Sequence, residues 1–179
     1  DQLDGLTVTP ASNSDSDFTL SVTAASSESG TIATTLATLP VTVTGVADAP
    51  SLTVQAASGA EDSAINLDIT SSLSDADGSE VLSVTVSDIP DGAVLSAGTI
   101  NSDGSVTLTA DQLDGLTVTP ASNSDSDFTL SVTATSTESA SGGAATTSTT
   151  SLPVTVTGVA DTPSLTVQAA SGAEDSAIN

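Results

Sequence analysis

Apolar and polar residues alternate in many short stretches of the chain. In 128–134, the sequence FTLSVTA places Phe, Leu, Val and Ala at alternate positions, with Thr and Ser between them. This period of two is typical of a β-strand with one buried face, and we expect Phe128 to lie in the core. Strands are predicted at 51–55, 65–69, 81–89, 93–100, 105–109, 116–120, 128–134 and 152–159.

Turn residues separate these stretches. The sequences SGAED (58–62) and NSDG (101–104) predict turns, the second of them within a β-hairpin. ADQLDGL (110–116) has the spacing of one helical turn, and the low-complexity segment 136–150 predicts a mobile surface loop. About seven or eight short strands without a long helix predict an all-β fold, an antiparallel β-sandwich of Ig or cadherin type.

Long segments of the sequence occur twice. Residues 1–24 recur at 111–134, and residues 41–66 recur at 154–179 with a single difference. A period of about 110 residues matches whole domains in series rather than solenoid repeats, so we interpret the chain as a window on a longer linear array. The predicted units are the C-terminal portion of one repeat (1–49), a complete repeat (50–162) and the N-terminal portion of the next (163–179).

The composition excludes several classes of function. The chain has no Lys, Arg or His and a net charge of −23, so it should repel nucleic acids and anionic membranes. Charged residues make up only 13% and apolar residues 37%, which favours a folded chain over a disordered one. The absence of Cys excludes a disulfide framework. No apolar run reaches membrane-spanning length.

Catalysis is not expected. The chain offers no His, Cys, Lys or Tyr as a base or nucleophile, and its serines therefore lack a triad partner. Two carboxylates can serve a glycosidase, but two Phe are the only aromatic residues and provide no platform for a sugar.

Asp75, Asp77 and Glu80 form an acidic loop with a D-x-D-G spacing. Ca²⁺ takes six to eight oxygen ligands, and such loops supply several at once. The later ligand positions of an EF-hand are missing. A solvated acidic turn is the alternative, but no cationic side chain of this protein could neutralise the carboxylates.

Other acids are expected beside the linkers between repeats. If the strands alternate in direction, Glu61 and Asp62 lie at the pole next to the following linker and Asp161, whereas Asp75 and Asp77 lie next to the preceding linker and Asp48. Bound Ca²⁺ would then turn a repelling hinge into a stiff joint. Asp125 and Asp127 suit a Ca²⁺ site and a plain hairpin turn equally well. The candidate metal ligands are Asp48, Glu61, Asp62, Asp75, Asp77, Glu80, Asp125, Asp127, Asp161, Glu174 and Asp175.

Several motifs together resemble a known family. They are G-x-E-D-x-A-I-x-L-x-I, L-x-D-A-D-G-S-E-x-L-S-V and I-P-D-G-A-x-L-S within 59–96, LTADQLDGLTVTP (108–120), DFTLSVTAT (127–135) and the VAD-x-P linker. They are similar to repeats of very large RTX-type adhesins, which leave Gram-negative bacteria through type I secretion. The likeness covers the whole chain. The Gly-Gly-x-Gly-x-Asp nonapeptides that mark the secretion end of such proteins are absent.

The resemblance implies an extracellular structural extender on the bacterial cell surface, with a role in cell adhesion and biofilms. Ca²⁺ at the junctions would stiffen it, with ligands at Asp48/Asp161, Glu61/Glu174, Asp62/Asp175, Asp75, Asp77 and Glu80. Its partners would be neighbouring repeats of the same chain. The Asp-Arg-Glu and Asp-x-Asn-Asp-Asn motifs of eukaryotic cadherins are absent. The alternatives are a subunit of an extracellular fibre or sheath, which would contact other copies laterally, and a module that binds glycans or ice.

Overall fold

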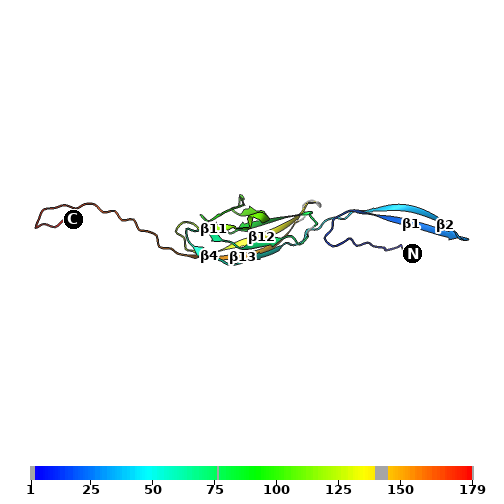
Figure 1. Ribbon diagram of the computed structural model, residues 1–179, viewed down its shortest axis with the longest axis horizontal. Coiled ribbons are helices and arrows are strands. Elements are labelled where there is room, and N and C mark those ends of the chain that lie inside the picture. The colour runs from blue at the N-terminus through cyan, green and yellow to red at the C-terminus, as the bar shows by residue number, and fades with distance from the viewer. Residues whose placement is uncertain (1–2, 76, 140–144, 179) are drawn as a thin grey trace.

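The computed structural model describes residues 3–75, 77–139 and 145–178 and is all-β. A β-sandwich-like body occupies the centre of an elongated molecule (Figure 1). A two-stranded hairpin extends from one end of this body, and the C-terminal segment runs away from the other end without regular structure. The part of the chain that the structure describes contains no helix long and apolar enough to cross a membrane.

The strands are short except for the four that form two long hairpins. The first hairpin consists of β1 (Phe18–Glu28) and β2 (Thr31–Val41), and the second of β12 (Phe128–Glu138) and β13 (Ala145–Thr157). The remaining elements are β3 (Ser51–Val54), β4 (Ala57–Ala60), β5 (Ile65–Asn66), β6 (Ile69–Ser72), β7 (Glu80–Ser87), β8 (Val94–Leu95), β9 (Thr99–Ile100), β10 (Val106–Leu108), η1 (Ala110–Gln112) and β11 (Thr117–Thr119).

The core lies between one large sheet and two small ones. The large sheet has the strand order β4-β13-β12-β7-β10-β9, and the small sheets are β5-β11-β8 and β3-β6. Alternate residues of the long strands, such as Leu130, Val132 and Val84, are completely buried. From the other layer, Ile65 and Val118 pack into the same cluster. The predicted β-sandwich architecture is therefore confirmed at this coarse level.

Four local predictions are wrong. The low-complexity segment 136–150 is mostly strand, since β12 continues to Glu138 and β13 begins at Ala145; residues 140–144 lie outside the described part. The first three residues of SGAED belong to β4 and only the last two to a turn, and β4 pairs with β13 in a parallel register rather than the expected antiparallel one. Residues 93–100 form two strands in different sheets, because a break at 96–98 separates β8 from β9. The predicted strand 65–69 is divided in the same way, since residues 67–68 separate β5 from β6.

Other local predictions are confirmed. The turn at 101–104 joins β9 to β10, and the helical turn forms as the 3-10 helix η1. The expectation that Phe128 lies in the core is not met: its side chain is half-buried and packs against the core from outside.

The two long hairpins share one register. Leu20 lies opposite Leu39 in the first hairpin, as Leu130 lies opposite Leu152 in the second. The turn of the first hairpin consists of Ser29 and Gly30, both with positive φ. The three-residue difference in length between the two copies falls at the hairpin tip, beyond the last shared pairs.

Threonines form a row across the outer face of the large sheet. The register places one Thr on each of five neighbouring strands directly beside the next. The hydroxyls of Thr133 and Thr149 lie 2.9 Å apart, within hydrogen-bonding distance. The row therefore presents uncharged hydroxyl groups on the outer face. The row consists of Thr149, Thr133, Thr85, Thr107 and Thr99.

Candidate metal site where the hairpin meets the sandwich

An acidic loop connects β6 to β7 at the end of the sandwich that faces the N-terminal hairpin. Asp75 is 6% exposed although it lies in a loop, and its Oδ1 accepts a hydrogen bond from the N–H of Asp77 at 2.9 Å. Asp77 itself is exposed. Its Oδ1 accepts hydrogen bonds from the N–H (2.9 Å) and the hydroxyl (2.6 Å) of Ser79. These donors, the hydroxyl first, lower the pKa of Asp77 below its ordinary value.

Two glutamates close the core at this end. Glu80 on β7 and Glu138 on β12 are direct cross-strand partners, and their side chains are 7% and 1% exposed. Oε1 of Glu80 accepts a hydrogen bond from the N–H of Asp48 at 2.7 Å, whereas its buried Oε2 has no hydrogen-bond partner among the described residues. Oε2 of Glu138 accepts one from the hydroxyl of Ser79 at 3.1 Å. Like charges in such pairs repel each other.

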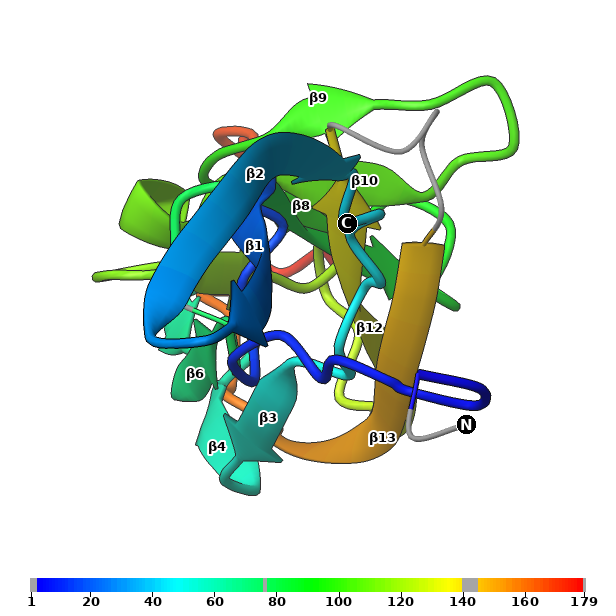
Figure 2. The same ribbon diagram turned by 90° about the vertical axis from the view of Figure 1, so that its right-hand side faces the viewer.

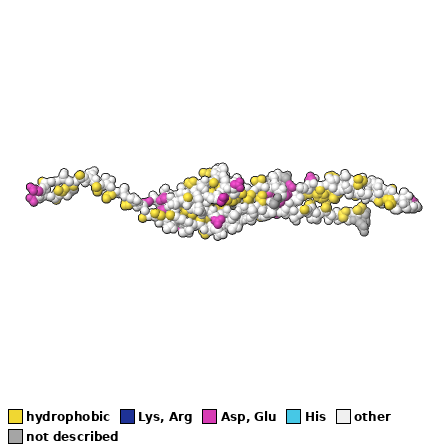
Figure 3. All heavy atoms as spheres, viewed as in Figure 1, with side chains coloured by type: hydrophobic (Ala, Val, Ile, Leu, Met, Phe, Trp, Pro, Cys, Tyr) yellow, Lys and Arg dark blue, Asp and Glu magenta, His cyan; other side chains and the backbone are white. Residues whose placement is uncertain are grey.

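The N-terminal part of the chain covers these acids. A pocket of about 250 Å³ lies between the two parts, and Asp15, Asp48, Asp75, Asp77 and Glu138 all contribute to its wall. Figure 3 shows acidic side chains gathered where the hairpin meets the sandwich. The pocket therefore brings together acidic residues from both sides of the junction and from the linker.

Gly45 allows the linker to pass close to Glu138. A Cβ atom at this position would lie 2.5 Å from Oε2 of Glu138, which is too short for any contact. Gly45 has no positive φ that would require glycine. We conclude that glycine is required at this position because it is small, and not because of its conformational freedom.

A second group of acids lies at the opposite end of the sandwich. Glu61 is 8% exposed, and its Oε1 accepts a hydrogen bond from the N–H of Val159 at 2.7 Å. Asp62 has a φ of 57° and accepts one from the N–H of Asn123 at 3.0 Å. These bonds hold the ends of three segments together. The acids lie at the two poles that the alternation of strands predicted.

The hairpin-turn acids belong to this second group. Oδ1 of Asp127 accepts a hydrogen bond from the N–H of Val156 at 2.8 Å, as Asp17 does from Val43 in the first copy. A Cβ atom on Gly158 would lie 3.2 Å from Oδ2 of Asp125 and 3.6 Å from Oε1 of Glu61. Asp127 therefore has a structural role in its turn, and Asp125 lies beside Glu61.

The remaining predicted ligands are not gathered into either group. Asp161, Glu174 and Asp175 are exposed in the extended C-terminal segment. Asp48 contacts the first group through its backbone N–H and not through its carboxylate. Among the described residues, no three acidic side chains converge closely enough to hold an ion as they stand.

The acids at the end of the sandwich that faces the hairpin, the first group, nevertheless have the chemistry that suits a hard divalent cation. The set consists of carboxylate oxygens, which are the ligands that Ca²⁺ prefers. The buried Oε2 of Glu80 accepts no hydrogen bond from the described residues, so it is open to a donor or cation from outside them. Asp75, Asp77, Glu80 and Glu138 would hold the ion.

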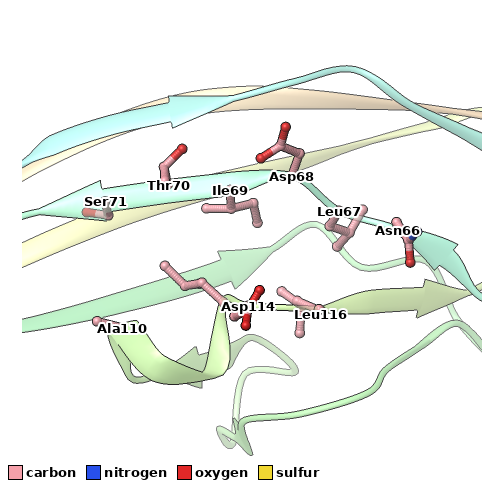
Figure 4. A pocket seen from close by; sticks show the side chains of 11 residues that line it. Asn66, Leu67, Asp68, Ile69, Thr70, Ser71, Ala110, Asp114 and Leu116 are labelled. Atoms are coloured by element: carbon pink, nitrogen blue, oxygen red, sulfur yellow. The ribbon is translucent and has the colours of Figure 1, made fainter.

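A larger groove of about 440 Å³ lies elsewhere, between β6 and η1. Figure 4 shows Leu67, Ile69 and Leu116 on its walls, with the carboxylate of Asp68 on the other side of its strand. Asp114 is the other acid of this lining and lies on the opposite wall. The groove therefore brings no set of carboxylates together.

Glu138 is an acid of the junction that the sequence analysis did not name as a candidate ligand. Glu138 continues the buried positions of β12 (Leu130, Val132, Ala134 and Ser136), so a longer reading of the same alternation would have placed an acid on the inner face. Asp15 is the first-copy equivalent of Asp125, and its N–H lies 3.4 Å from Oδ2 of Asp77.

Comparisons with known proteins give no family for this chain: no family model matches it, and no curated protein or solved structure is significantly similar.

Proposed function

We propose that the chain is a structural extender of a large adhesin on the surface of a Gram-negative bacterium. In this proposal its Ig- or cadherin-like domains stand in tandem, and Ca²⁺ bound at each junction holds neighbouring domains in line. The observation that carries the proposal is the buried pair Glu80 and Glu138. The motif resemblance to RTX-type adhesins supplies the biological setting.

The buried pair needs a positive charge from outside the protein. Removing carboxylates from water is costly unless an opposite charge compensates them, and the chain has no Lys, Arg or His. A proton or a metal cation remains. Extracellular Ca²⁺-binding modules have dissociation constants of about 10⁻⁴ to 10⁻³ M, so a site built from partly separated carboxylates suits that setting.

The two groups of acids would form halves of one junction. Gly45 and Gly158 occupy the same position of the repeated sequence. Gly45 lies against Glu138 of the domain that follows it, and Gly158 lies against Asp125 and Glu61 of the domain that precedes it. Superposing the repeats therefore brings acids of the preceding domain, the linker and the following domain around one glycine.

The linker is bonded to the sandwich at Asp48 and Ala49, but the direct contacts between the turn at 13–15 and the acidic loop are weak. The N–H of Asp15 lies 3.4 Å from Oδ2 of Asp77, and Nδ2 of Asn13 lies 3.5 Å from the carbonyl oxygen of Ser74. Both distances exceed the usual range of about 2.7–3.2 Å for such bonds. Ca²⁺ shared between Asp15, Asp77 and the buried glutamates would replace this loose contact by direct ligation and remove a hinge.

Small-angle X-ray scattering of the chain, with Ca²⁺ and with a chelator, tests the proposal. We expect a longer maximum dimension and a narrower distribution of shapes with Ca²⁺. The double variant Glu80→Gln/Glu138→Gln should show no Ca²⁺ effect. Glu28→Gln is the matched control, because Glu28 occupies the position of Glu138 in the first copy but is exposed. A maximum dimension that chelation leaves unchanged in the wild-type chain would remove the stiffening mechanism.

The threonine row favours a second candidate function, binding to ice or to a glycan. Neighbouring strands lie about 4.8 Å apart, so the row repeats hydroxyls at regular intervals across the sheet. The twist of such sheets works against a flat ligand surface. Inhibition of ice recrystallisation by the wild-type chain, lost in Thr85→Lys/Thr107→Lys but kept in the exposed control Thr70→Lys, would support this candidate, and equal inactivity of all three would exclude ice.

A further inference from the structure

The groove of about 440 Å³ lies where two paired segments of the chain separate. β5 pairs with β11, and the N–H of Leu67 continues this pairing by donating to the carbonyl oxygen of Leu116 at 2.9 Å. Beyond this bond one segment runs on into β6, whereas the other comes from η1 (Figure 4). The groove is therefore a gap in one layer of the sandwich, and its volume is in the usual range of ligand sites.

β6 has a free hydrogen-bonding edge on the side of this groove. β3 and β6 form a two-stranded sheet at one corner of the sandwich (Figure 2), and no other strand of the described chain pairs with β6. The N–H of Gln55 donates to the carbonyl oxygen of Asp68 at 3.0 Å, and these two residues continue the register of β3 and β6. Hydrogen-bonded pairs alternate along antiparallel strands, so the N–H and C=O groups of Ile69 and Ser71 point away from β3, toward the groove.

The groove is apolar at its floor and acidic at its rim. Asp68 and Asp114 are exposed and lie on opposite walls (Figure 4). The chain has no Lys or Arg that could neutralise them. The rim therefore favours positively charged side chains above an apolar floor. The floor consists of side chains that are at most 6% exposed, namely Leu67, Ile69, Leu113 and Leu116.

We propose that this groove binds an extended peptide segment of a partner protein, which pairs with the free edge of β6. In such strand addition, main-chain hydrogen bonds give affinity and the side chains at alternate positions give specificity. Successive side chains of the added strand point to opposite faces. Its inward side chains would be apolar, and its outward side chains would be Lys or Arg beside Asp68 and Asp114, because opposite charges on neighbouring strands attract.

The occupant is therefore a segment in which apolar and basic residues alternate. This sequence contains no such segment, because it has no Lys or Arg. A second copy of it would also bring further carboxylates to an acidic rim. The groove shares no residue with the acidic pocket beside the hairpin, so peptide binding does not depend on metal at the junction.

Nitrogen–proton correlation NMR of the whole chain locates the binding of a defined probe. The probe is the hexapeptide acetyl-Lys-Val-Lys-Val-Lys-Val-amide, and its control is acetyl-Lys-Lys-Lys-Val-Val-Val-amide, which has the same charge and composition without the alternation. We expect the alternating peptide to shift the amide signals of Ile69 and Ser71 and to slow their exchange with solvent, equally with Ca²⁺ and with chelator. The control peptide should cause neither effect.

Two variants separate the main-chain contribution from the charge contribution, with isothermal titration calorimetry as the measurement. Ser71→Pro should abolish binding, because proline lacks the N–H that faces the groove and is tolerated at a free strand edge. Its matched control is Ser71→Ala, which loses the hydroxyl bonded to the carbonyl oxygen of Ser51 but keeps the N–H and should bind. Asp68→Asn/Asp114→Asn should lower the affinity about five-fold. Asp91→Asn, an exposed acid outside the groove, should have no effect.

Three results would overturn the proposal. They are the absence of binding, equal affinity for the two peptides, and an equal loss of affinity in Asp68→Asn/Asp114→Asn and Asp91→Asn, since the last two would mean that net charge alone attracts the peptide. If Ser71→Pro unfolds the chain, the charge variants and the shifts of Ile69 and Ser71 decide.

Discussion

Glu80 and Glu138 lie directly opposite each other on adjacent strands, and the protein has no cationic side chain to place between them. Both belong to the inner face of the large sheet, at the point where the apolar core ends. The pair is costly when both groups are ionised. The fold therefore contains, at one end, a charge imbalance that an external cation would relieve.

Replacing Glu138 by Gln should distinguish the effect of this residue on the stability of the fold from its effect on Ca²⁺ binding. We expect Glu138→Gln to raise the melting temperature in chelator, because one of two repelling charges is gone, and to remove most of the increase that Ca²⁺ gives the wild type. Ligand at a hundred times its dissociation constant stabilises a protein by about 2.7 kcal/mol, which corresponds to several degrees. Differential scanning calorimetry with and without Ca²⁺ measures both effects.

Glu28→Gln is the control for that experiment, since Glu28 has the same local sequence but is exposed. It should leave the melting temperature of the sandwich and its Ca²⁺ dependence unchanged. If Glu138→Gln is equally destabilising in both buffers, the glutamate pair acts through folding and not through an ion.

A methyl group on Gly45 should disturb the junction. The Cβ atom of Gly45→Ala would collide with the carboxylate of Glu138. The linker and the carboxylate would have to separate, and we expect Ca²⁺ affinity to fall about ten-fold, as for other changes that reorient a ligand. Isothermal titration calorimetry measures the affinity. Gly158→Ala is the matched control, because its Cβ would lie 3.2 Å from the nearest atom and should cost less.

Asp103 should contribute to acid sensitivity without involving metal. Its Oδ1 accepts hydrogen bonds from the N–H (3.0 Å) and the hydroxyl (2.7 Å) of Ser105. These donors lower the pKa of Asp103 below 3.8. A pKa that is lower in the folded state adds stability above the unfolded pKa, and this stability is lost as the pH falls through the folded pKa.

We therefore expect Asp103→Asn to lower the free energy of unfolding at pH near neutral, by the same amount with Ca²⁺ and with chelator. The difference from wild type should shrink as the pH falls below about 4. Urea denaturation at several pH values tests this, and a difference that stays constant across the acid range would contradict it.

Replacing the two equivalent leucines by Ala should lower the free energy of unfolding by different amounts. Leu130 is completely buried, whereas Leu20, at the same position of the first hairpin, is half-buried. Leu130→Ala should cost about 2–5 kcal/mol by leaving a cavity. Leu20→Ala should cost clearly less, since water already reaches this side chain. Urea denaturation followed by circular dichroism measures both, and equal costs would mean that the hairpin is covered in solution.

The sequence predicted the core better than the edges of the strands. Alternation placed Leu130, Val132 and Ala134 on one face, because burial and the period of a strand coincide there. It failed for β4, whose ASGA sequence has no branched or aromatic side chain to signal a strand. It also failed for the start of β13, where Thr and Ser fill both faces and imitate a loop.

The grouping of acids at the junction was predicted in part for the same reason. Asp75, Asp77 and Glu80 are close in sequence, so a local motif reveals them. Glu138 reaches Glu80 only through strand pairing over a long separation, which no local pattern encodes. For Asp48 the motif predicted a carboxylate ligand, but the residue reaches the site with its backbone N–H. A motif that only counts acidic residues cannot distinguish a carboxylate contact from a backbone contact.

The unequal lengths of the two hairpin tips show where this fold tolerates inserted residues. Residues added beyond the last shared pair leave the register of both strands untouched, and Glu138 keeps its position opposite Glu80. Insertions there are structurally silent for the interior and for the acidic pair. The copies can thus differ in sequence and length at their hairpin tips. Each tip can then present its own residues to the outside while the rest of the sandwich stays the same.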